Sequence, residues 1–135
     1  MNKMTFNSKS DNFETTITVA SQQSDLFICD VAASDTDKAA EIAGKVNNWL
    51  NENFDKIKAF AAEKLLDIKN DSWLEEDEIP LTSAAFANQI ELDAITAFAD
   101  GSLEIYFFDN DIFWGHSIQV SVDSDFVLSD ADITG

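Results

Sequence analysis

One short segment of this chain gathers residue types that could ligate a metal ion: Asp109, Asp111 and His116. An Asp-x-Asp pair opens many calcium-binding loops, but the glycine and the closing glutamate that such a loop requires are missing. Zinc or iron would need further ligands, and the chain has one histidine and one cysteine. We interpret these residues as turn formers followed by a structural histidine, and a small metal-binding domain remains an alternative.

The same segment places His116 directly before Ser117, a pair of residue types found in hydrolases. Neighbouring residues of a strand point to opposite faces, so this pair cannot act as base and nucleophile. The sequence contains no Gly-x-Ser-x-Gly motif, phosphate-binding loop or dinucleotide fingerprint. Cations that could bind an anionic substrate are also scarce. We therefore expect no enzymatic activity and no cofactor.

An acidic link at residues 73–80 points to binding instead. It contains four consecutive carboxylates beside a tryptophan. An acidic surface with a few aromatic anchors suits rapid capture of a basic protein, because opposite charge raises the association rate and desolvated side chains hold the complex. We predict that the link shares a partner surface with acidic turns further along the chain. The predicted partner-binding residues are Trp73, Glu75, Glu76, Asp77, Glu78, Asp109, Asp111, Trp114, Asp123 and Asp125.

The distribution of charge supports a basic partner. The chain has 26 acidic residues, eight lysines and no arginine, which gives a formal net charge of −18. Lys69 is the last basic residue, and residues 70–135 carry fifteen Asp and Glu. This charge disfavours nucleic acid and anionic membranes as direct partners. Adaptation to high salt is an explanation without a partner, but the absence of arginine beside many Phe and Asn fits an AT-rich genome better.

The composition indicates a folded domain. A chain of 135 residues, 45% hydrophobic, is long enough to bury a core, so we take residues 1–135 as a single acidic domain. Cys29 lies among strand-forming residues and is expected to be a buried apolar residue of a cytosolic protein. We see no N-terminal signal pattern and no apolar run of about 18 residues. We therefore expect a cytoplasmic location.

Hydrophobic periodicity places these residues on an α+β fold. Residues 13–19 and 26–31 alternate and predict an N-terminal β-hairpin with its turn at 21–24. Ser34 or Asp35 can cap a helix, and apolar residues then recur with a helical period over 36–69. A continuous helix of this length measures about 50 Å. We therefore expect a long or broken helix, with the kink or break in the asparagine cluster at 47–53.

The second half predicts a short helix and then a C-terminal antiparallel β-meander. Thr82 can cap a helix over 83–88. Strands are expected at 90–98 and 102–108, joined by a hairpin turn at Asp100-Gly101. A turn at 109–111 leads towards a strand at 118–122. A last turn at 123–125 precedes a final strand near 126–128.

Several blocks of sequence resemble a bacterial domain family of unknown function. The most specific block is F-W-G-H-S-I at residues 113–118, and further blocks lie at 65–78, 81–86, 100–104 and 131–135. The resemblance covers about residues 65–135 and implies no catalytic residues. By type, a compact and highly acidic cytosolic chain also resembles the immunity proteins that bacteria keep beside contact-dependent and other polymorphic toxins.

These observations lead to one hypothesis and two alternatives. We expect an immunity protein that binds and neutralises a cognate toxin domain, with a basic nuclease as the expected partner. Its acidic face is expected to occlude the cationic groove of that toxin. One alternative is a nucleic-acid mimic that inhibits a DNA-binding protein with the same carboxylates. The other is the small metal-binding or enzymatic domain centred on Asp109, Asp111 and His116.

Overall fold

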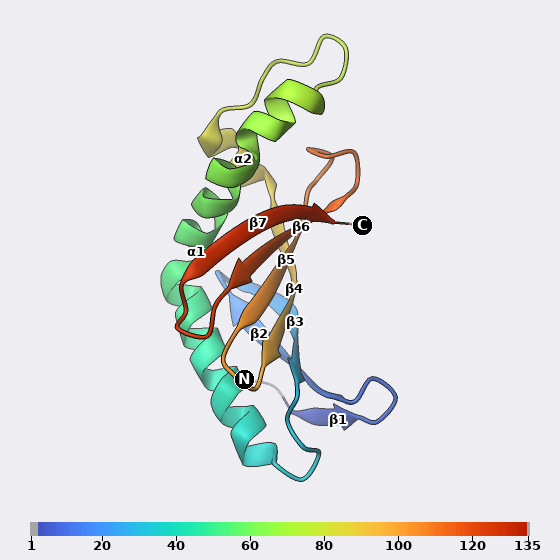
Figure 1. Cartoon of the computed structure of the whole chain (residues 1–135), viewed down its shortest axis with the longest axis vertical. Coiled ribbons are helices and arrows are strands. Elements are labelled where there is room, and N and C mark those ends of the chain that lie inside the picture. The colour runs from blue at the N-terminus through green and yellow to red at the C-terminus, as the bar shows by residue number, and fades with distance from the viewer. Residues whose placement is uncertain (1–2, 135) are drawn as a thin grey trace.

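The computed structural model describes residues 3–134, which form one seven-stranded sheet with a long helix along one of its faces (Figure 1). Met1, Asn2 and Gly135 lie outside the described residues, so the last residue of the 131–135 block is not described. The strands lie in the sheet in chain order. They are β1 (Thr5–Asn7), β2 (Asn12–Val19), β3 (Gln22–Cys29), β4 (Glu91–Phe98), β5 (Leu103–Phe108), β6 (Ser117–Val122) and β7 (Leu128–Thr134).

Two helices connect the first three strands to the last four. Helix α1 (Thr36–Ser72) and helix α2 (Ser83–Gln89) lie between β3 and β4, which are the only parallel neighbours among the described strands. All the other neighbouring strands are antiparallel, as short turns require. The predicted α+β order of hairpin, long helix, short helix and antiparallel meander is confirmed.

The N-terminal hairpin turns at Ala20 and Ser21. Both residues have positive φ, 49° and 69°, which matches the twist of a two-residue hairpin turn. The turn is therefore shorter than the predicted 21–24, and β3 begins already at Gln22. Strand β1 was not predicted, because three residues are too few to show an alternating pattern.

Helix α1 runs without a break, so the expected break in the asparagine cluster is wrong. Asp35 caps the helix, its carboxylate accepting the N–H of Lys38. Within the cluster, Asn51 Nδ2 donates to the carbonyl of Thr18 at 2.9 Å, and Asn51 Oδ1 accepts the N–H of Ala20 at 3.2 Å. The asparagine therefore fastens the helix to the hairpin instead of interrupting it.

The C-terminal elements follow the prediction except at the last strand. Thr82 caps α2, and Gly101 adopts a φ of +95° in the turn between β4 and β5. The final strand was expected near 126–128, but Phe126 lies in a turn with φ +59° and packs against Trp49 with ring centroids 5.2 Å apart. Strand β7 starts only at Leu128. Its polar, solvent-facing residues hid the alternation in the sequence.

The core lies between α1 and the sheet face that the helix covers. Small and branched side chains on α1 recur with helical spacing and are fully buried. The core residues of α1 include Ala39, Ala43, Val46, Leu50, Ile57, Ala61 and Leu65. They meet alternate residues of the strands, including Phe13, Leu26, Ile95, Ile105, Phe107, Ile118 and Val120. Neither described helix has the length together with the apolar character that crossing a membrane requires.

Cys29 is more exposed than expected. It lies half-buried at the end of β3, on the sheet face opposite α1. Burial and the nearby Asp30 carboxylate raise the pKa of its thiol, so the thiol is protonated at neutral pH.

The tie between helix and hairpin predicts different effects for two asparagines of α1. Asn51→Ala removes two hydrogen bonds to the hairpin and should lower the free energy of unfolding by about 1–2 kcal/mol. Asn53 donates only to Trp49 of its own helix, at 2.9 Å. Asn53→Ala should change stability by no more than about 0.5 kcal/mol, since alanine favours the helix. Urea denaturation measures the free energy of unfolding of both variants. Equal losses would show that the Asn51 hydrogen bonds do not fasten the helix to the hairpin.

Candidate partner-binding site

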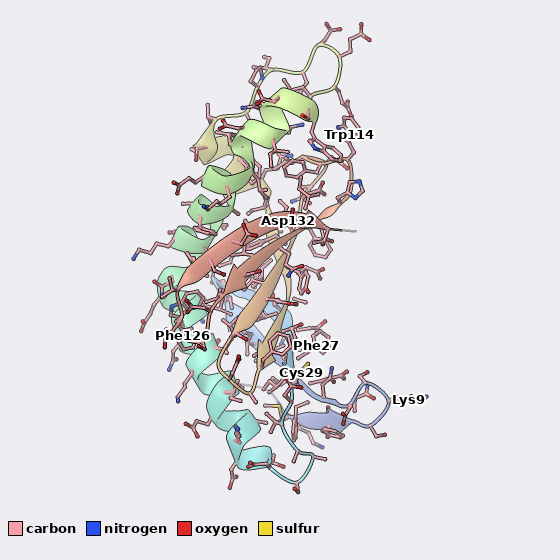
Figure 2. The ribbon with its side chains drawn as sticks, viewed as in Figure 1. Lys9, Phe27, Cys29, Trp114, Phe126 and Asp132 are labelled. Atoms are coloured by element: carbon pink, nitrogen blue, oxygen red, sulfur yellow. The ribbon has the colours of Figure 1, made fainter. Side chains whose placement is uncertain are left out.

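One end of the molecule brings together the end of α1, the acidic link and the loop between β5 and β6. We call this region the tip and define it as residues 69–78 and 109–116. In Figure 1 the link forms the top of the molecule and the 109–116 loop lies below it to the right, beyond the end of β5. Figure 2 shows Trp114 at the outer side of this region.

The tip is built on a buried cation. Lys69, the last basic residue of the chain, is 0% exposed. Its Nζ donates to the carbonyl of Trp73 at 2.8 Å and lies 3.0 and 3.1 Å from the two carboxylate oxygens of Glu78. Glu78 Oε1 also accepts the N–H of Glu75 at 2.9 Å. This backbone hydrogen bond and Lys69 lower the pKa of Glu78, and together the contacts hold the link against the helix end.

An aromatic cluster joins the helix end to the loop. The ring centroid of Trp73 lies 5.6 Å from that of Phe113, 4.8 Å from that of Trp114 and 5.4 Å from that of His116. Phe113 is fully buried and also contacts Phe86 of α2, whereas Trp114 is 53% exposed. Edge-to-face contacts of this kind fix the orientation of an aromatic ring. The cluster therefore presents one tryptophan to solvent in a defined position.

Asp109 organises the loop from inside. It is only 5% exposed, and its carboxylate accepts the N–H groups of Asp111 at 3.2 Å, Phe113 at 2.8 Å and Gly115 at 3.1 Å. Trp114 has a φ of +57°, a conformation that a bulky residue adopts only when its surroundings impose it. The three hydrogen bonds supply that constraint. Asp109 thus holds the backbone so that Phe113 turns inward and Trp114 outward.

Helix α2 fastens the loop from the other side. Gln89 Nε2 donates to the carbonyl of Asn110 at 2.7 Å, and Asn110 Nδ2 donates back to the carbonyl of Gln89 at 2.6 Å. Between loop, link and α2 lies an open hollow of about 550 Å³, lined by Glu75, Glu78, Gln89, Asp111 and Trp114. A cationic group that enters this hollow meets carboxylates and an indole ring, both of which attract positive charge.

The structure gathers part of the predicted residue set and separates the rest. Trp73, the link carboxylates, Asp111 and Trp114 all belong to the tip. Asp109 also lies there but faces inward. Asp123 and Asp125 lie at the opposite end of β6, in the turn before β7 (Figure 1). Asp123 Oδ1 accepts the N–H groups of Asp125 at 2.8 Å and Val127 at 3.1 Å, so it shapes that turn.

The three residues considered as metal ligands do not converge on one point. Both carboxylate oxygens of Asp109 are engaged by backbone N–H groups, and His116 packs against Trp73. Within residues 3–134, no group of three or more His, Cys, Asp or Glu side chains is placed to hold a metal ion.

Sequence reasoning missed two supporting residues, Lys69 and Gln89. Lys69 lies four residues after the buried Leu65 and eight after the buried Ala61, so it falls on the apolar stripe of α1. A lysine on such a stripe indicates a buried cation that needs a nearby carboxylate, and the acidic link supplies one. Gln89 gave no signal, because its partner is a backbone carbonyl of a distant loop.

Fold and site together define a small α+β domain with an acidic and aromatic tip. The chain belongs to a bacterial family that is described as an uncharacterized protein conserved in bacteria (DUF2262), whose model matches residues 1–133. The match therefore extends through the N-terminal half, beyond the blocks at 65–135. No match was found among curated proteins or among solved structures.

The role of Asp109 can be tested against its neighbour. Asp109→Asn replaces one acceptor oxygen with an amide that cannot accept from the loop N–H groups, and should lower the free energy of unfolding by about 1–3 kcal/mol. Asp111→Asn makes the same chemical change at an exposed residue with positive φ, which asparagine tolerates. It should change the free energy of unfolding by no more than about 0.5 kcal/mol. Chemical denaturation followed by tryptophan fluorescence measures both. Equal effects would contradict an organising role for Asp109.

The Lys69–Glu78 pair predicts a pH-dependent stability difference. Glu78→Gln should lower the melting temperature more than Glu76→Gln, because it leaves Lys69 buried without its counter-charge. The pKa of Glu78 is lowered in the folded state, so its stabilisation is fully present above the unfolded pKa of about 4.3 and is lost as the pH falls through the folded pKa. The difference between wild type and Glu78→Gln should therefore shrink in acid. If the difference in melting temperature persisted unchanged at low pH, the Lys69–Glu78 ion pair would not be the source of the stabilisation.

Proposed function

We propose that this protein is an immunity protein that binds a cognate toxin domain and neutralises it, the toxin being a basic nuclease. The observation that supports this most is the tip, where exposed carboxylates surround an exposed tryptophan. The protein acts by occlusion, because the tip occupies the cationic groove in which the toxin holds nucleic-acid phosphates. In this proposal it works in the bacterial cytoplasm without a cofactor, and it does not itself catalyse a reaction.

The carboxylates of the tip fall into two groups with different roles. Glu78 and Asp109 hold the tip together through Lys69 and through backbone N–H groups. Glu75, Glu76, Asp77 and Asp111 are exposed, and their side chains make no hydrogen bond or ion pair within the described residues 3–134. Their negative field therefore extends into water, where it can steer a cationic partner.

Trp114 supplies the anchor that charge alone does not give. Its ring rests against Trp73, and its backbone is fixed by the Asp109 hydrogen bonds. A side chain that is already ordered loses little entropy when a partner covers it. Tryptophans in such positions contribute a large share of the binding free energy of many interfaces. The tip thus combines long-range attraction with a rigid contact point.

The proposal is tested with the product of the neighbouring gene as the candidate toxin, in a form made inactive by substitution. The tip variant is Glu75→Gln, Glu76→Gln and Asp77→Asn, which leaves the structural Glu78 intact. The matched control is Glu52→Gln, Glu63→Gln and Asp67→Asn, which removes the same charge from exposed positions of α1. Association rates are measured by stopped-flow fluorescence over a series of salt concentrations.

The tip variant should associate roughly tenfold more slowly at low salt, and the difference should narrow as salt screens the charges. The control should differ from wild type by less than about threefold. Failure of the wild-type protein to bind the toxin would refute the immunity function. Equal slowing in both variants would show that only net charge matters. Tight binding to several unrelated DNA-binding proteins would favour a nucleic-acid mimic instead.

A further inference from the structure

The sheet has a second face that neither helix covers. Helix α1 packs against one side only, and the other side faces solvent between the β1–β2 hairpin and the 109–116 loop (Figure 1). The strand register shows which residues share this uncovered face. One row across β2–β7 contains Thr16, Asp25, Ala94, Tyr106, Gln119 and Asp132. The next row contains Glu14, Phe27, Thr96, Glu104, Ser121 and Asp130.

The centre of the uncovered face is aromatic. Phe27 on β3 and Phe98 on β4 are diagonal neighbours, and Tyr106 and Phe108 follow each other on one side of β5. Phe27, Phe98 and Tyr106 are half-buried, and Phe108 is 50% exposed. Between the two pairs lie the short side chains of Ala94 and Thr96 on β4, and Glu104 on β5 lies opposite Thr96. Four aromatic rings thus lie on one solvent-facing surface.

Carboxylates surround these rings without matching cations. Glu104 accepts the Tyr106 hydroxyl hydrogen bond at 2.7 Å, and burial together with this carboxylate raises the pKa of Tyr106 to about 12. Asp93 lies at the bulge in β4, where burial and then Asp25 raise its pKa. Strands β2 to β7 contain no lysine. One cation, Lys3, lines a hollow with Glu14 and Asp25 beside β1.

The charge of this face selects among possible occupants. A second copy of the chain would bring like charges together, and nucleic acid or an anionic membrane would be repelled as well. An exposed aromatic patch within a carboxylate rim has the anatomy of a protein interface, with anchors at the centre and polar groups around them. The complementary surface is basic and carries apolar side chains that can contact the rings.

We propose that the uncovered sheet face, centred on Phe27, Tyr106 and Phe108, is a second docking surface for a basic protein. It lies on β3–β5 and adjoins the tip, because Phe108 directly precedes Asp109. One partner that spans both surfaces would contact the acidic link and the sheet together. The identity of that partner as the toxin rests on the proposed function. The existence of the docking surface does not, since it depends only on the chemistry of the face.

The direct test maps a defined probe onto the intact protein by NMR. The probe is a short peptide in which lysine alternates with phenylalanine, titrated into 15N-labelled protein. Amide shifts should concentrate on β3, β4 and β5, around Phe27, Phe98 and Tyr106. A peptide with serine in place of phenylalanine should bind at least roughly fivefold more weakly, because it lacks the apolar contacts. Shifts confined to α1 or to the tip, or no shifts, would overturn the proposal.

A second test compares two variants of the protein. It distinguishes failure of the docking surface from failure of the proposed function. The double variant, Phe27→Thr with Phe108→Thr, removes two of the three central aromatic rings and keeps residues that favour strands. The control, Ile68→Thr, removes an apolar side chain of α1 that is 43% exposed, close to the 50% of Phe108. The double variant should bind both peptide and toxin at least roughly fivefold more weakly than the wild type. The control should bind both as tightly as the wild type does.

Each outcome has one meaning. Peptide binding that the double variant leaves unchanged would overturn the docking surface. Toxin binding that the double variant leaves unchanged would exclude the toxin as the occupant of this face and leave the immunity function standing. A toxin that does not bind, together with peptide shifts on the face, would refute the function and support the surface. Sedimentation that shows a dimer dissociated by the double variant would identify a second copy as the occupant, which contradicts the proposal.

Discussion

The constraint on which the structure depends is the absence of any cation after Lys69. Beyond this residue, a carboxylate can be compensated only by a lysine from the first half of the chain, by an N–H or O–H donor, by water or by another molecule. The structure uses N–H donors at Asp100, Asp109 and Asp123, each of which shapes a turn by accepting hydrogen bonds from the backbone. It uses Lys69, the last lysine along the chain, for Glu78. The other acids of this half lie almost all at the surface, and in the proposed function they attract the basic partner.

The fold converts an asymmetry along the sequence into an asymmetry in space. Helix α1 carries six of the eight lysines and seven acids, so it is nearly neutral, and the remaining two lysines lie near β1. The tip and the uncovered sheet face therefore hold most of the net charge of −18. Both surfaces also expose aromatic side chains. A helix layer that stabilises the core and a charged sheet layer that faces outward is an arrangement suited to binding.

Local signals were enough to predict most of the elements, although not β1 or the start of β7, whereas tertiary partners decided the site. Asp35 and Thr82 cap their helices as expected, because capping depends on residues within the next turn. The asparagine cluster and Asp109 could not be predicted in the same way. Asn51 bonds to a hairpin more than thirty residues away, and Asp109 turns inward because the loop N–H groups converge on it. The residues next to a carboxylate in the sequence do not reveal whether it turns inward to hold a loop, as Asp109 does, or faces solvent, as Asp111 does.

The most direct test of this account is amide hydrogen exchange of the protein in complex with the proposed partner, a basic toxin domain made inactive by substitution. Exchange should slow in residues 73–78 and 109–116 and along β3–β5, since the partner covers the tip and the uncovered sheet face. The outward side of α1 should exchange as it does in the free protein. Slowed exchange confined to α1, with the tip unchanged, would contradict the central claim that the tip and the uncovered sheet face form the binding surface.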